Sequence, residues 1–134
     1  MKVYNCKNCG IERKATYSST NTYCSNKCQK LFESAKRIKA WLKTGKGAGK
    51  NVIKNWMLKE QDCRCAICSI ENKWNDEPLM FILDHIDGNS QNNVRQNLRL
   101  ICSNCDSQLD TYKSKNRGNG RHARRERYAE GKSY

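Results

Sequence analysis

The sequence predicts a small α+β protein with two units, each closed around four cysteines. Its 134 residues suffice for one domain, or for a small domain with an appendage, and only 37% of them are apolar. Apolar residues follow helical spacing within the first 60 residues and form short extended runs after residue 80. A core this thin usually needs a further tether, from disulfides or from bound metal, and the chain carries nine cysteines.

Eight of these cysteines fall into two quartets with metal-ligand spacing. The pairs are "CKNC" and "CSNKC" near the N-terminus, then "CAIC" and "CSNC" further along. Such pairs bring two thiolates onto one ion at about 2.3 Å, and two pairs complete a closed tetrahedron. We therefore expect two structural zinc ions, neither with a position open to water. The first quartet is Cys6, Cys9, Cys24 and Cys28, and the second is Cys65, Cys68, Cys102 and Cys105.

Zinc is favoured over disulfides by the expected compartment. The stretch "MKVYNCKNCG" has no apolar segment of a signal peptide, and no apolar run is long enough to span a membrane. We expect a cytoplasmic protein without a membrane partner, in which thiols stay reduced.

Cys63 is left over from the two quartets. In "CRCAIC" it could replace Cys65 as a ligand, but the two-residue spacing to Cys68 favours Cys65. Cys63 is then expected to be an inert, partly buried thiol.

Residues 1–44 form the first expected unit, a four-cysteine finger followed by a helix. The stretch "YCSNKCQ" resembles the small treble-clef or FCS-like zinc fingers, in which this segment opens a helix, and Ser25 is a natural N-cap. The opposite face of the helix carries basic residues that are either solvated or in contact with phosphate. The residues expected on its apolar face are Leu31, Phe32, Ala35, Ile38, Trp41 and Leu42.

Residues 45–60 are expected to form a Gly/Lys linker and a short helix. The linker "KTGKGAGKN" lacks the G-x-x-x-x-G-K-[ST] pattern of a nucleotide-binding loop, and no apolar strand precedes it. The apolar residues that follow, Val52, Ile53, Trp56 and Met57, indicate core packing.

Charge divides the chain into three parts. Residues 1–60 carry 14 Lys/Arg and 3 Asp/Glu, residues 61–112 carry 4 and 8, and residues 113–134 carry 8 and 2. Basic flanks thus enclose an acidic centre within a net charge of +13. This pattern suits a protein that binds phosphates with its flanks and holds a cation at its centre.

The acidic centre contains a predicted strand, turn, strand and helix. The strand "FILDHI" is followed by the turn "DGNSQNN", the return strand "NLRLIC" and a helix with Ser103 as N-cap. Neighbouring side chains of a strand point to opposite faces, so Asp84 and His85 should diverge unless the strand bends. Asn89, Asn92 and Asn93 read as turn residues, one of which could assist the hairpin.

The run "LDHIDGN…NLRLICSNCDSQ" closely resembles the HNH, or ββα-metal, endonucleases over residues 61–117. The combination of Asp-His, Asn-Leu-Arg-Leu and two cysteine pairs in this order is specific. The resemblance implies a ββα-metal core in which His85 is the general base and Asp84 binds a catalytic divalent cation. It also implies that Asn97 holds the hairpin loop by backbone hydrogen bonds and so orients the histidine.

Asp106 departs from this family pattern. It directly follows Cys105, where the family has His or Asn. An aspartate can bind a hard cation, so we expect Asp84 and Asp106 to hold Mg²⁺ or Mn²⁺ rather than zinc. Asn116 would be a substitute ligand if Asp106 turned away.

The basic C-terminal segment, with residues 118–134 as a tail, is expected to bind the phosphates of a nucleic acid. His122 within it is expected to be solvated. The candidate phosphate-binding residues are Lys113, Lys115, Arg117, Arg121, Arg124, Arg125 and Arg127.

The function implied by the resemblance is a metal-dependent endonuclease or nickase acting on DNA, most readily duplex DNA, in a bacterial or phage-infected cytoplasm. A double-strand break would need a homodimer, two successive nicks or a partner protein. Two other hypotheses stay open. One is a noncatalytic zinc-finger protein that binds DNA on a nuclease scaffold, and the other is a nuclease that acts on RNA.

Overall fold

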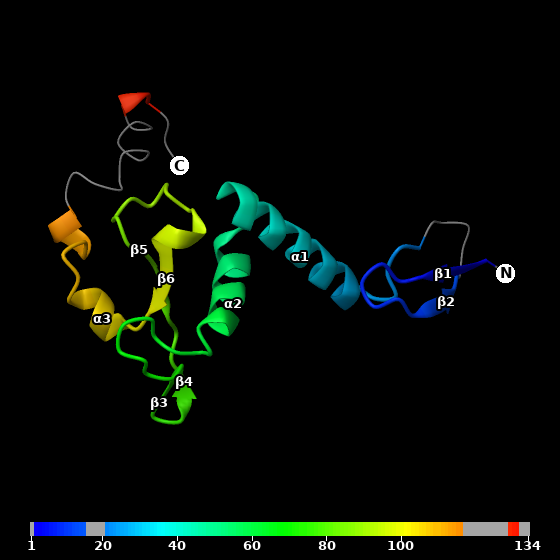
Figure 1. The fold of residues 1–134 in the computed structure, drawn as a ribbon, viewed down its shortest axis with the longest axis horizontal. Coiled ribbons are helices and arrows are strands. Elements are labelled where there is room, and N and C mark those ends of the chain that lie inside the picture. Colours follow the sequence, from blue (N-terminus) through cyan, green and yellow to red (C-terminus); the bar gives the residue numbers. More distant parts are fainter. Residues whose placement is uncertain (1, 16–20, 117–128, 132–134) are drawn as a thin grey trace.

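The computed structural model describes residues 2–15, 21–116 and 129–131, and over these the chain has the expected α+β fold. Figure 1 shows the N-terminal finger at one end of a long helix and the remaining elements gathered around the other end. The elements in order are β1 (Val3–Asn5), β2 (Glu12–Lys14), α1 (Asn26–Thr44), α2 (Lys50–Glu60), β3 (Lys73–Trp74), β4 (Glu77–Pro78), β5 (Ile82–His85), η1 (Arg95–Asn97), β6 (Leu98–Ile101), α3 (Ser103–Ser107) and η2 (Lys113–Asn116).

The N-terminal finger consists of an antiparallel hairpin and the start of α1. β1 and β2 pair with Tyr4 opposite Arg13. Helix α1 begins after Ser25, whose side chain accepts a hydrogen bond from the backbone N–H of Cys28 at 3.2 Å. This confirms Ser25 as the N-cap, which satisfies one of the free donors of the first turn.

Helix α1 ends at its C-cap, Gly45. This glycine has a φ of +71° and donates its N–H to the carbonyl of Trp41 at 2.7 Å. A Cβ at this position would lie 3.0 Å from Cγ1 of Val94. Both the left-handed backbone and the close approach to Val94 therefore require glycine here.

The apolar face predicted for α1 is only partly buried. Ile38 and Trp41 are buried, but Leu31 and Leu42 are 51% and 46% exposed, and Ala35 is exposed as well. All six residues expected on the apolar face lie in α1, but the core covers only part of that face. Only the C-terminal part of the helix reaches the core, while its N-terminal part spans the distance to the finger (Figure 1).

The core lies between α2 and the hairpin β5–β6. Ile53 and Met57 of α2 are buried against the inward side chains of β6, and Trp56 packs edge-on against Trp41 at a centroid distance of 5.6 Å. Three cysteines of the second quartet belong to the same buried cluster. Its other members are Ile38, Phe81, Leu98, Leu100 and Ile101.

The predicted hairpin is confirmed. β5 and β6 pair antiparallel, with Asp84 opposite Arg99 and His85 opposite Leu98. The following helix differs from the prediction, because its N-cap is Cys102 and not Ser103. Cys102 has the extended backbone of an N-cap, with φ −75° and ψ 161°, and α3 already begins at Ser103, one residue earlier than predicted. Helix α3 has only five residues.

Among the described residues, no helix combines the length and the apolar character needed to cross a membrane.

We predict that Gly45→Ala destabilises the protein, because alanine would be strained at this φ and would crowd Val94. The free energy of unfolding should fall by about 1–3 kcal/mol, measured by denaturant titration. Gly49→Ala is the matched control, since a Cβ at Gly49 meets no atom within 4 Å. An equal loss in both variants would contradict this account.

Candidate functional site

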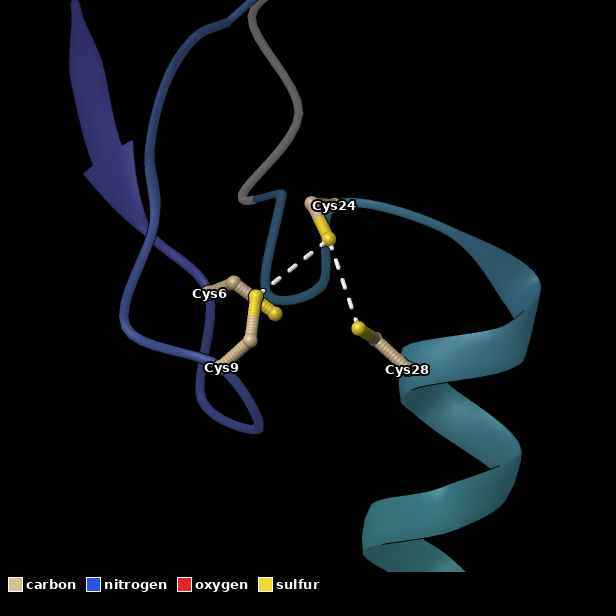
Figure 2. A group of neighbouring side chains, drawn as sticks. All are labelled: Cys6, Cys9, Cys24 and Cys28. Carbon is tan, nitrogen blue, oxygen red and sulfur yellow. Dashed lines mark hydrogen bonds between the residues drawn. The ribbon is translucent and has the colours of Figure 1, made fainter.

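Each predicted cysteine quartet comes together in the structure. Within each, the four sulfur atoms lie within 4.8 Å of one another. In the first quartet, Cys24 Sγ lies 3.6 Å from Cys9 Sγ and 3.4 Å from Cys28 Sγ (Figure 2). In the second, the Sγ atoms of Cys68 and Cys102 are 3.7 Å apart.

These distances fit a tetrahedral ion and not disulfides. Four metal–sulfur bonds of about 2.3 Å place neighbouring sulfurs about 3.8 Å apart, whereas a disulfide joins them at about 2.05 Å. All nine cysteines have free thiols. Cys63 is half-buried, has a φ of 56° and lies outside both quartets, so the spacing argument that favoured Cys65 agrees with the structure.

The electrostatics of both quartets favour a bound cation. Burial would raise the pKa of Cys6 and of Cys65, but backbone N–H groups around each sulfur lower it to about 6. One such donor is the N–H of Cys102, 3.3 Å from Cys65 Sγ. By contrast, the neighbouring thiols Cys28 and Cys9 raise the pKa of Cys24 to about 12. A second, third and fourth thiolate thus need a positive ion between them.

Both clusters tie a cysteine pair to the start of a helix. In the first, Cys6 and Cys9 lie in the loop after β1, and Cys28 lies in the first turn of α1 (Figure 2). In the second, Cys65 follows α2, and Cys105 lies in α3. The second cluster therefore holds the base of the β5–β6 hairpin.

Asp84 and Asp106 lie close to each other at the interface of β5 and α3. Asp84 is 7% exposed, and Arg99 donates from Nε to its Oδ2 at 2.7 Å. Burial and then the charge of Asp84 raise the pKa of Asp106, while Lys113 lowers it. Two neighbouring carboxylates that disfavour each other's charge match the oxygen ligands of a hard divalent cation.

His85 is held by a residue of the hairpin loop. Its Nε2 lies 2.9 Å from Oδ1 of Asn93. Because an amide oxygen only accepts hydrogen bonds, Nε2 carries the hydrogen, and in the neutral ring Nδ1 keeps its lone pair. The backbone carbonyl of Asn93 in turn accepts a hydrogen bond from Trp41 Nε1 at 2.6 Å. Helix α1 thus supports the residue that orients the imidazole.

Asn97 closes the hairpin loop. Its Oδ1 accepts from the N–H of Asp87 at 3.0 Å, and its Nδ2 donates to Asp87 Oδ1 and to the carbonyl of Asn92, both at 2.8 Å. The amide of Asn92, followed by the N–H of Asn89, lowers the pKa of Asp87. Asp87 therefore belongs to the hydrogen-bond network of the loop.

Asn116, considered from the sequence as a substitute metal ligand, makes a hydrogen bond within the fold. Its Nδ2 donates to the carbonyl of Gly88 in the hairpin turn at 2.8 Å. Lys113 and Lys115 lie in η2 next to it and are exposed. The other predicted phosphate-binding residues, Arg117, Arg121, Arg124, Arg125 and Arg127, lie outside the described residues.

Three residues with a role in this arrangement were missed. Asn93 was considered only as one of several turn residues. Arg99 lies opposite Asp84, so their contact could have been predicted from the register of the two strands. Trp41 had no local signal, since it is separated from Asn93 by 52 positions.

We predict two zinc ions per chain, and their loss with single ligand substitutions. Cys105→Ser and Cys28→Ser should each reduce bound zinc from about two ions to about one, measured by elemental analysis of the purified protein. The Cys105 variant should also unfold more readily, because this cluster is part of the core. Cys63→Ser should retain both ions, and loss of zinc from this control would refute the ligand assignment.

Comparison with known proteins supports the family resemblance. Over 69 residues the chain is 42% identical to the H-N-H endonuclease F-TflIV of Escherichia phage T5. The match takes in 52% of this chain but spans only 29% of the relative's length. No protein-family model matches the chain, and no solved structure gave a significant match. Over this stretch the chain is similar to an H-N-H endonuclease, and the hairpin and the two cysteine clusters agree with that resemblance.

Proposed function

We propose that this protein is a metal-dependent endonuclease that hydrolyses phosphodiester bonds of DNA, with His85 as the general base. The observation that supports this most directly is the hydrogen bond between His85 Nε2 and Asn93 Oδ1, next in the chain to a buried carboxylate. It leaves one nitrogen of a held imidazole available for proton transfer. The homologous phage protein is named an endonuclease, and we extend that activity to this chain.

In the proposed reaction, Nδ1 of His85 removes a proton from a water molecule. The hydroxide oxygen bonds to phosphorus, and the bond from phosphorus to the 3′ oxygen breaks with its electron pair on that oxygen. The 3′ oxygen then takes up a proton from solvent, and the imidazolium returns its proton to solvent, so the products carry a 5′-phosphate and a 3′-hydroxyl. Nε2–H of the ring stays bonded to Asn93 Oδ1 throughout, which keeps the ring in place and stabilises the imidazolium.

The two carboxylates would hold the divalent cation. Arg99 occupies Oδ2 of Asp84, so Oδ1 is the oxygen proposed to bind the cation together with the carboxylate of Asp106. An ion such as Mg²⁺ or Mn²⁺ would stabilise the charge that develops on the phosphate and on the leaving oxygen. Asp106 replaces the His or Asn of the family pattern, and its oxygen ligand suits this class of ion.

The alternation of side chains along β5 indicates where the scissile phosphate would lie. Asp84 and His85 leave β5 on opposite faces, and among the described residues β5 pairs with β6 alone. A phosphate at the unpaired edge of β5 could reach both side chains. One such site cuts one strand, so cleavage of both strands requires a second copy, a second event or a partner protein.

Duplex DNA is the proposed substrate, and the basic residues of η2 and of the C-terminal tail are proposed to contact its backbone. We also propose that the protein acts in the cytoplasm of a bacterium or of a phage-infected cell, because metal binding by both quartets requires thiols that stay reduced.

We predict that the protein relaxes supercoiled plasmid in the presence of Mg²⁺ or Mn²⁺, and that His85→Ala lowers this rate about 10²- to 10⁴-fold because the general base is lost. Zinc content should be unchanged in the variant, since His85 belongs to neither quartet. The matched control is His122→Ala, which substitutes the chain's other histidine and should cut like the wild type.

Binding of DNA without cleavage under either ion would refute the enzymatic proposal in favour of a binding protein. Cleavage of RNA but not of DNA would refute the substrate.

We further predict that Asn93→Ala lowers kcat about 10²-fold, because the ring of His85 would lose the contact that orients it. KM should change little, since no proposed phosphate contact is removed. Asn89→Ala is the control within the same loop, because Asn89 bonds the N–H of Gln91 and not the histidine. An equal loss of kcat in both variants would mean that loop stability, and not the orientation of His85, is responsible.

A further inference from the structure

A groove leads to His85 from the side of helix α2. It has a volume of about 470 Å³ and runs between the first turns of α2 and the strand β5. His85 lines it together with Lys50, Lys54, Met80 and Phe81. Both lysines belong to the basic flank of residues 1–60, but neither is among the candidate phosphate-binding residues named from the sequence, which all lie after residue 112.

The charge of this groove is unbalanced. Lys50 is exposed and Lys54 is half-buried, and neither forms an ion pair within the described parts of the chain. The first turn of α2 contains no acidic residue, and its N-cap, Gly49, supplies no side-chain hydrogen bond. The positive end of the helix therefore adds to the charge of the two lysines.

The spacing of the two lysines matches a nucleic-acid backbone. They are four residues apart on α2, so they lie on the same face and about 6 Å apart along the helix axis. Successive phosphates of one strand advance about 3.4 Å along the duplex axis, and because the backbone winds around that axis they lie farther apart in space than this rise, so the spacing of the lysines suits two neighbouring phosphates. The opposite wall offers an apolar surface for deoxyribose, because Met80 is 74% exposed.

We propose that this groove holds one strand of the DNA substrate directly beside the scissile phosphate, with Lys50 and Lys54 each binding a backbone phosphate. This inference rests on the proposed function and adds the path of the cleaved strand. The strand then passes from the groove over His85 to the unpaired edge of β5, where the proposed chemistry takes place.

The test compares two double variants that remove the same charge. Lys50→Gln/Lys54→Gln removes both groove lysines and keeps residues that favour a helix. Lys59→Gln/Lys73→Gln removes two lysines that do not line the groove. Both pairs are placed in a His85→Ala background, and their affinity for a duplex containing a mapped cleavage site is measured over a series of salt concentrations.

In the groove variant, the slope of log affinity against log salt should fall by about 2, because two phosphate contacts are lost. The slope of the control pair should stay at the value of the His85→Ala protein. A neutral methylphosphonate at a phosphate next to the cut should weaken binding by the His85→Ala protein about 10-fold and have little further effect on the groove variant. Equal slopes for the two pairs, or equal effects of the methylphosphonate, would overturn the inference.

The same proteins with His85 intact separate this inference from the proposed function. A wild-type chain that never nicks DNA overturns the function itself. If the wild type nicks and Lys50→Gln/Lys54→Gln nicks at the same rate and with the same KM, the function stands and the groove assignment fails.

Discussion

Four thiolates can share a space a few ångströms wide only if a cation lies between them, and the second cysteine cluster places this constraint at the centre of the fold. Its ligands come from the segment after α2, from the end of β6 and from α3, and three of the four are buried with the apolar core. Holding the ion therefore fixes the end of β6 relative to α2 and α3. A core with so few aliphatic side chains could not by itself fix the positions of β6, α2 and α3 relative to one another.

The arrangement around His85 follows from that fixed hairpin. With β6 in register, Arg99 lies opposite Asp84, and α3 brings Asp106 near the same carboxylate. The loop that joins the strands is closed from within by Asn97 and held from outside by the hydrogen bond from Trp41 to Asn93. Trp56 packs against that tryptophan and lies under Arg95 at 5.5 Å, so both helices help to support the loop. The N-terminal helix thus contributes to the geometry of a site that lies outside its own unit.

Local patterns predicted much of this arrangement. The cysteine pairs, the N-cap at Ser25 and the two strands depend on neighbours close in sequence, and all were recognisable. The contact of Trp41 with Asn93 was not, because it depends on how the end of α1 packs on the loop. Periodicity also indicated an apolar face on α1 without showing that Leu31 on this face is half exposed. The start of α3 was misplaced by one residue, since the extended backbone of Cys102 continues from β6.

Among the described residues β5 pairs with β6 alone, so the backbone groups along its other edge are unpaired, and this has a consequence outside the site. Unpaired backbone N–H and C=O groups at the edge of a strand can pair with a strand of another molecule. An element that covered this edge would prevent such pairing, but it would also keep a substrate away. This strand is only four residues long and carries a charged residue at its third position. Both properties discourage pairing between molecules, so the short length and the charge of β5 protect the edge along which the substrate is proposed to lie.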